Sequence, residues 1–162
     1  MGRLDDGQCR VENPDGGVPH LSSGNTRREE AAVATEFRVI LPDKPGALAQ
    51  VGRILGDARI NIEAIQGMSR DGKSVIQFVA NDPTRVATTL DKAGMSYARR
   101  EVLVVHVLDE PGTLGDVALV MANAGINIDS VYVTTRGHVI LGVDDLDGAV
   151  HVAAGMAVMD GE

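Results

Sequence analysis

Two Pro-Gly turns carry the residues whose types and spacing suggest chemistry. Pro45-Gly46 and Pro111-Gly112 each separate an apolar run from a stretch with helical spacing, and Asp43 or Asp109 stands two residues before the proline. The first amides of a helix have no intrahelical partner and lie at the positive end of the helix dipole, so they can bind a small carboxylate. Glycine lets such a group approach the backbone, and a nearby aspartate can accept from an ammonium group. Each turn therefore predicts a site for a free amino acid.

The same residues also suit a structural role. A Pro-Gly pair between strand and helix makes a good turn, and Asp43 is a plausible cap for the helix that follows. Asn61 and Asn127, which interrupt apolar strand starts, either close a turn through their own backbone or face a ligand. The binding hypothesis takes in both turns and both asparagines: Asp43, Pro45, Gly46, Ala47, Leu48, Asn61, Asp109, Pro111, Gly112, Thr113, Leu114 and Asn127.

The two turns belong to an internal repeat with a constant offset of 66 residues. Between 42–65 and 108–131, nine of 24 positions are identical, far more than unrelated segments share. A unit of about 65 residues buries little of its own surface, so we expect the two units to share an interface. The predicted organisation is a disordered or linker tail over 1–35, a first domain over 36–101 and a second over 102–162.

Apolar periodicity predicts the elements that position the first turn. The expected order is strand, helix, strand, strand, helix and strand, over 37–41, 47–58, 60–65, 74–80, 83–94 and 95–100. This is a split βαβ unit of the α+β class, with a four-stranded antiparallel sheet and both helices on one face, the ferredoxin-like arrangement.

The second unit repeats this order almost without a linker. Its predicted strands and helices cover 103–107, 112–124, 126–134, 139–143 and 146–154. Only Met156–Met159 remains for a last strand, so the second unit is expected to be truncated there. Residues 1–35 have no periodicity over most of their length and are rich in polar and turn-forming residues, which favours a disordered or linker segment.

Composition excludes several classes of function. The net charge of −8 and the 2% of aromatic residues argue against a nucleic-acid partner. The single cysteine and four scattered histidines, His20, His106, His138 and His151, lack metal-ligand spacing. No apolar run reaches the length of a membrane span and no signal peptide is recognisable, so we expect a cytoplasmic protein without metal or cofactor.

The repeated motif resembles that of the ACT domain, a small regulatory module that often binds amino acids. The resemblance rests on Asp-x-Pro-Gly-x-Leu followed by Ile-Asn-Ile, at 43–48 with 60–62 and at 109–114 with 126–128. It implies that the sheets pair side by side through the second strand of each unit. It also implies that the turn at 43–48 works with Asn127, and the turn at 109–114 with Asn61. Leu41 and Val107 stand where serine-regulated members have His, and Asp43 and Asp109 where they have Asn.

Three functions are open at this point. The first is a non-catalytic regulatory protein that binds a free amino acid between its units, acts on a separate enzyme or regulator, and forms a homodimer. The second is a ligand-independent interaction module that regulates an enzyme or a transcription factor. The third, a small enzyme, has the least support because no nucleophile or acid–base constellation is recognisable.

Overall fold

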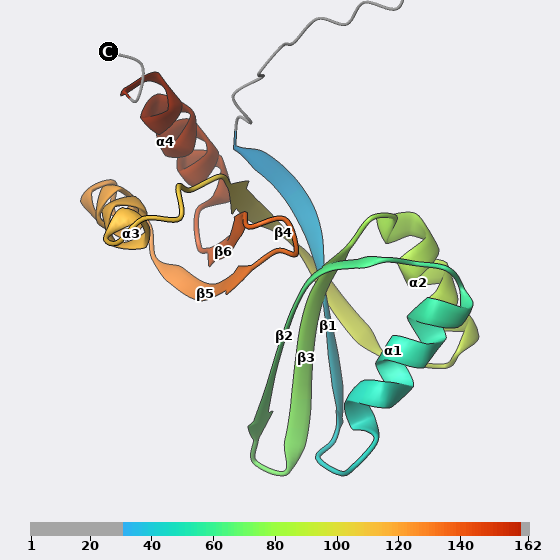
Figure 1. The fold of residues 1–162 in the computed structure, drawn as a ribbon. Helices are drawn as coiled ribbons and strands as arrows, with labels where there is room; N and C mark the ends of the chain where they lie inside the picture. The colour runs from blue at the N-terminus through green and yellow to red at the C-terminus, as the bar shows by residue number, and fades with distance from the viewer. Residues whose placement is uncertain (1–30, 160–162) are drawn as a thin grey trace, which may run out of the picture.

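The computed structural model describes residues 31–159, with side chains described as far as Met156; the predicted tail over 1–30 lies outside this part. Six strands and four helices follow one another along it (Figure 1). They are β1 (Ala32–Pro42), α1 (Ala47–Asp57), β2 (Ile62–Arg70), β3 (Lys73–Ala80), α2 (Pro83–Lys92), β4 (Tyr97–Val105), α3 (Thr113–Asn123), β5 (Ile128–Val133), β6 (Val139–Val143) and α4 (Leu146–Met159).

The strands form one six-stranded antiparallel sheet in the order β2-β3-β1-β4-β6-β5. The predicted α+β class and the ferredoxin-like units are confirmed, but the two sheets have merged. Two four-stranded units need only six strands here because β1 and β4 each serve twice. Glu36–Pro42 of β1 pairs with β3 in the first unit, while Ala32–Thr35 pairs with β4 in the second.

The β1–β4 pair lies on a pseudo-twofold axis that follows the sequence repeat. Phe37 pairs with Arg99 and Val33 pairs with Leu103, and adding 66 to the β1 residue of one pair gives the β4 residue of the other. Thr35 pairs with Glu101, its own counterpart at the same offset, and so marks the axis. The register irregularity in β2 between Ile62 and Ala64 also recurs 66 residues later in β5.

This sharing corrects the prediction for the end of the second unit. Met156–Met159 is not a strand; it continues helix α4, which begins at Leu146. The edge of β4 that a last strand would occupy is already paired with Ala32–Thr35, so the C-terminal segment has no strand to join. For the same reason β1 begins at Ala32, earlier than the predicted start near Phe37.

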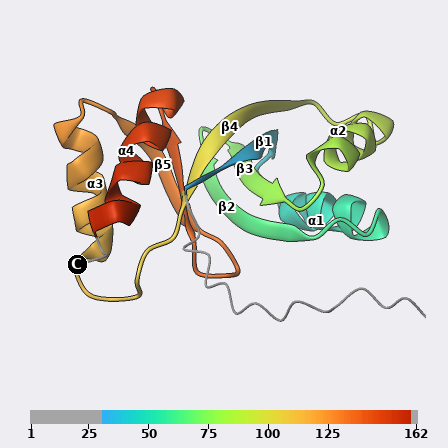
Figure 2. The same ribbon diagram turned by 90° about the horizontal axis from the view of Figure 1, so that it is seen from above.

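The outer face of the sheet carries all four helices, because strand side chains alternate between faces. Figure 2 shows α1 and α2 on one side of the molecule and α3 and α4 on the other, with the strands between. Phe37, Phe78 and Leu55 belong to the core under α1 and α2. Leu103, Leu141 and Met121 belong to the core under α3 and α4.

The inner face, free of helices, curls on itself. An isolated antiparallel bridge joins Ala64 of β2 to Thr134 just beyond β5, and the amide of Thr135 donates to the carbonyl of Glu63 at 2.7 Å. The resulting hollow is filled by an inner apolar cluster: Ala64, Val79, Val102, Tyr132 and Ile140. None of the helices in the described part of the chain has the length and apolarity that a membrane crossing requires.

Candidate functional site

The two predicted turns have the same backbone geometry. Gly46 is the N-cap of α1 with φ 94°, and Gly112 is the N-cap of α3 with φ 101°. A side chain at these positive φ values would be strained, so glycine is required at both. No side chain caps either helix. The amide of Ala47 donates to the carbonyl of Lys44 at 3.2 Å, which leaves the next amides of the first turn facing outward.

The aspartates do not cap the helices, which corrects the prediction for Asp43. Its carboxylate accepts a hydrogen bond from the Ser74 hydroxyl at 2.9 Å, and its amide donates to the carbonyl of Gly72 at 3.0 Å. The first turn is therefore tied to the β2–β3 hairpin. Asp109 makes no hydrogen bond or ion pair with any described residue, because β6 is three residues shorter than β3 and its hairpin does not reach the turn.

Asn61 and Asn127 have equivalent surroundings. The Asn61 amide donates to the side chain of Asn81 at 3.0 Å, and the Asn127 amide donates to Asp144 at 2.9 Å. Both asparagines are exposed. Neither side chain makes a hydrogen bond with a described residue, so both amide groups are open to a ligand.

The structure joins the units differently from the pairing that the resemblance implied. The long contact is β1–β4, and the second strands of the units, β2 and β5, meet through one bridge at Ala64. The clefts described below are lined by neither asparagine and by no residue of the turns. The combination of each turn with the asparagine of the other unit thus stays a prediction.

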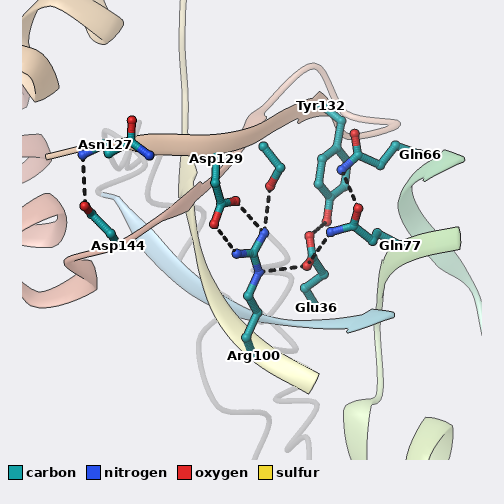
Figure 3. A network of polar contacts seen from close by, with 9 residues as sticks. Glu36, Gln66, Gln77, Arg100, Asn127, Asp129, Tyr132 and Asp144 are labelled. Atoms are coloured by element: carbon teal, nitrogen blue, oxygen red, sulfur yellow. Dashed lines mark hydrogen bonds and ion pairs between the residues drawn. The ribbon is translucent and has the colours of Figure 1, made fainter. Parts of the chain in front are cut away.

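A polar network on the inner face was not predicted from the sequence. Figure 3 shows Glu36 at its centre, with a side chain only 1% exposed. The carboxylate accepts from the Gln77 amide at 2.9 Å, the Arg100 guanidinium at 2.9 Å and the Tyr132 hydroxyl at 2.8 Å. Gln77 in turn accepts from the Gln66 amide at 3.1 Å. A buried carboxylate with three donors is fully compensated, so the network is compatible with a stable core.

Arg100 extends the network to the other edge of the sheet. Its guanidinium donates to both oxygens of Asp129, at 2.6 and 2.8 Å, and to the hydroxyl of Ser130 at 2.8 Å. The hydrogen bond from Arg100 holds the pKa of Asp129 below its usual range. Burial, followed by the hydrogen bond to Glu36, raises the pKa of Tyr132 well above that of a free tyrosine. The network thus fastens β5 to the shared strands β1 and β4.

The inner face breaks the symmetry of the repeat. Adding or subtracting 66 places Val102 opposite Glu36 and Ala34 opposite Arg100, so the partner positions are apolar. Gly142 makes room for the network: a Cβ atom there would collide with Arg100, Ser130 and Asp129. Charge at one copy of a strand position and an apolar residue at the other was the available sequence signal.

An open cleft of about 650 Å³ lies on the inner face beside this network. Its floor consists of two rows of cross-strand neighbours from β1, β3 and β2. Its other wall is the stretch 128–131 of β5. The floor residues are Arg38, Gln77 and Gln66 in one row and Ile40, Val75 and Met68 in the next, with Arg70 at the rim.

The histidines lie closer together than the sequence suggested, but they form no metal centre. The rings of His106 and His138 contact each other edge to face, with centroids 5.5 Å apart. Within residues 31–156 no third His, Cys, Asp or Glu joins them in a group that could hold an ion.

Comparison with known proteins identifies the family. The model of the ACT domain matches residues 35–93 and 102–154. A protein from Bacteroides thetaiotaomicron, BT0572, has a similar structure, with a TM-score of 0.72 and 20% identity over 78% of this chain and 90% of that one.

The ligand-free regulatory subunit of aspartate kinase from Thermus thermophilus is also similar, with a TM-score of 0.60 and 17% identity over 80% and 95% of the two chains. Similarities at this level of identity establish the fold alone. Comparison with curated protein sequences gives no match. Because the family model covers both halves of the repeat, this chain belongs to the ACT domain family and carries the domain twice in tandem.

Proposed function

We propose that this chain is a non-catalytic regulatory protein that binds a free amino acid at its strand–helix turns. The observation that carries the proposal is the uncapped N-terminus of α1 and of α3, each behind a glycine in the left-handed region and 66 residues apart. These amides would bind the ligand carboxylate. Asp43 and Asp109 would accept from its ammonium group, and of the two only Asp109 is free of other partners among the described residues.

The binding site would lie between units, as is usual for this family. The turn at 43–48 would act with Asn127 and the turn at 109–114 with Asn61, through amide groups that are open in this chain. Apart from the bridge at Ala64, no described strand pairs with the outer edge of β2. A second copy of the chain could pair there, so we propose a homodimer. The ligand would favour one pairing of units and thereby change the grip on a separate enzyme or regulator.

The names of similar structures are consistent with this function. Besides the regulatory subunit from Thermus thermophilus, they include the aspartokinase alpha and beta subunits, with a TM-score of 0.57 and 20% identity over 80% of this chain and 97% of that one.

Thermal unfolding against a panel of amino acids at millimolar concentration tests the proposal. A ligand present at about 100 times its Kd stabilises by about 2.7 kcal/mol, which corresponds to a shift of several degrees in Tm. The shift should be lost in Gly46→Val or Gly112→Val. Gly94→Ala is the control, because it places a side chain at a similar positive φ, 65°, away from both turns. Asn127→Ala should weaken binding at the Asp43 turn and leave the other turn unchanged.

The second candidate, a ligand-independent interaction module, is favoured by one observation. Leu48 and Leu114 occupy the same position in both units and are 58% and 49% exposed. A shift with no amino acid would reject the sensor. Loss of partner binding in Leu48→Ser, with unchanged Tm, would then support the interaction module.

A further inference from the structure

The inner-face cleft differs from the turns in position and in chemistry. It lies on the face of the sheet that carries no helix, whereas both turns lead into helices on the outer face. Its volume of about 650 Å³ is in the range of small-molecule sites. It is bounded by β1, β2 and β3 of the first unit and by β5 of the second, so a bound molecule would touch both units.

Polar groups on both walls of the cleft are held in place from behind. Gln77, 4% exposed, is fixed by Glu36, and it fixes Gln66. On the opposite wall, Asp129 and Ser130 are fixed by Arg100. A lining whose orientation is set by buried partners loses little entropy when a ligand binds, which distinguishes a preorganised site from an ordinary surface.

The charge that remains available in this cleft is positive. Both oxygens of Glu36 and both oxygens of Asp129 already accept hydrogen bonds. Arg38, the cation of the polar row, makes no hydrogen bond or ion pair with any described residue. Its neighbour on β4 is Ala98, and a hollow of about 90 Å³ adjoins the two. A free guanidinium with space around it binds a carboxylate through two parallel hydrogen bonds.

The next row of the floor is apolar. Ile40 and Met68 both pair with Val75 and are 51% and 54% exposed. Neighbouring rows on one face of a strand are roughly 7 Å apart, which is the reach of a short alkyl chain. Exposed aliphatic side chains beside a fixed polar row form an amphipathic surface for a ligand with one charged end.

We propose that the inner-face cleft binds an aliphatic carboxylate, with its carboxylate on Arg38 and its alkyl body over Ile40, Val75 and Met68. An ammonium group beside the carboxylate gains nothing there, because the neighbouring carboxylates are already satisfied. The cleft therefore prefers a plain aliphatic acid to the amino acid of the same shape. This site does not depend on the function proposed for the turns.

The test is a titration of the full chain with 4-methylpentanoate, followed by the NMR methyl signals of Ile40 and Met68. We expect saturable shifts of these signals, and an affinity at least about tenfold weaker in Arg38→Gln, because a charge-assisted pair is lost. Arg53→Gln, at an exposed arginine of α1, is the matched control and should bind as the parent does. The neutral 4-methylpentanamide should not bind, and leucine should bind more weakly than the acid.

Three results would overturn the proposal. These are no saturable shift of the Ile40 and Met68 signals, equal affinity in Arg38→Gln and the parent, and leucine binding at these methyls as tightly as the acid. The Gly46→Val and Gly112→Val variants separate the two sites. They should keep the response to 4-methylpentanoate even if they abolish amino-acid binding, so failure at the turns and failure at the cleft are distinguishable.

Discussion

At the scale of single residues, the most constrained side chain is Glu36. It is buried, and its three donors come from β3, β4 and β5. Removal of one donor leaves part of the carboxylate unsatisfied in an environment without water, which costs more than the bond itself contributes. The tyrosine hydroxyl is the donor that can be deleted with the smallest change in shape.

Tyr132→Phe should lower the free energy of unfolding by about 1–3 kcal/mol, because Glu36 loses a donor and cannot regain it from water. The substitution should also change the pH dependence. Since folding raises the pKa of Tyr132, its contribution is fully present below the unfolded pKa of about 10 and is lost as the pH rises above it.

Urea unfolding from pH 7 to 11 measures both effects. The parent should lose stability above about pH 10 more steeply than Tyr132→Phe does. Tyr97→Phe is the control, because its hydroxyl makes no hydrogen bond with a described residue. Parallel curves for the parent and Tyr132→Phe would mean that the hydroxyl is not held as described.

At the scale of elements, the decisive feature is the double use of β1. Its first half completes the sheet of the second unit, although it precedes the first unit in sequence. Ala34 points inward against the inner apolar cluster, while Ala32, two residues earlier, is exposed. The stability of the second unit should therefore depend on residues that precede the whole repeat.

Ala34→Asp should lower the free energy of unfolding by about 1–3 kcal/mol, since it places a carboxylate beside Val102 and Val104 without a donor. Ala32→Asp is the matched control and should change stability by less than about 0.5 kcal/mol. Amide hydrogen exchange locates the effect. Faster exchange in β4 and β6 of Ala34→Asp is expected, and faster exchange in β2 alone would contradict the shared-strand arrangement.

At the scale of the whole molecule, the two cores cannot be independent. The core under α1 and α2 and the core under α3 and α4 use the same two central strands, and the Glu36–Arg100–Asp129 contacts join the outer strand β5 to them. Loss of one unit would leave the central strands unpaired along half their length, with unsatisfied backbone groups. Unfolding should thus be a single transition.

Met121→Ala tests this cooperativity. The side chain is fully buried under α3 and α4, so its truncation should cost about 2–5 kcal/mol. Hydrogen exchange should accelerate by the same free energy in β3 of the first unit as in β6 of the second. Unchanged protection in β3 would show that the units unfold separately. Ala118→Gly, at an exposed position of α3, controls for an effect on the helix alone.

The sequence by itself determined the features that depend on neighbours along the chain. Alternating apolar residues predicted the strands, helical spacing predicted α1 and α3, and the repeated Pro-Gly predicted turns that require a glycine at Gly46 and Gly112. These follow from local periodicity and backbone conformation, so a single copy of the motif suffices to infer them. The outer layer of the molecule was therefore predictable, and so was the family.

Only the tertiary structure decided how the two units share strands and what lines the inner face. Glu36 meets Arg100 and Tyr132 across 64 and 96 residues, and no local pattern relates positions so far apart. The role of Ala32–Thr35 in the second unit depends on an edge of β4 that exists only after both units have folded. Local periodicity selects the face to which a side chain points, but the partner that it meets on that face is set by the pairing of distant strands.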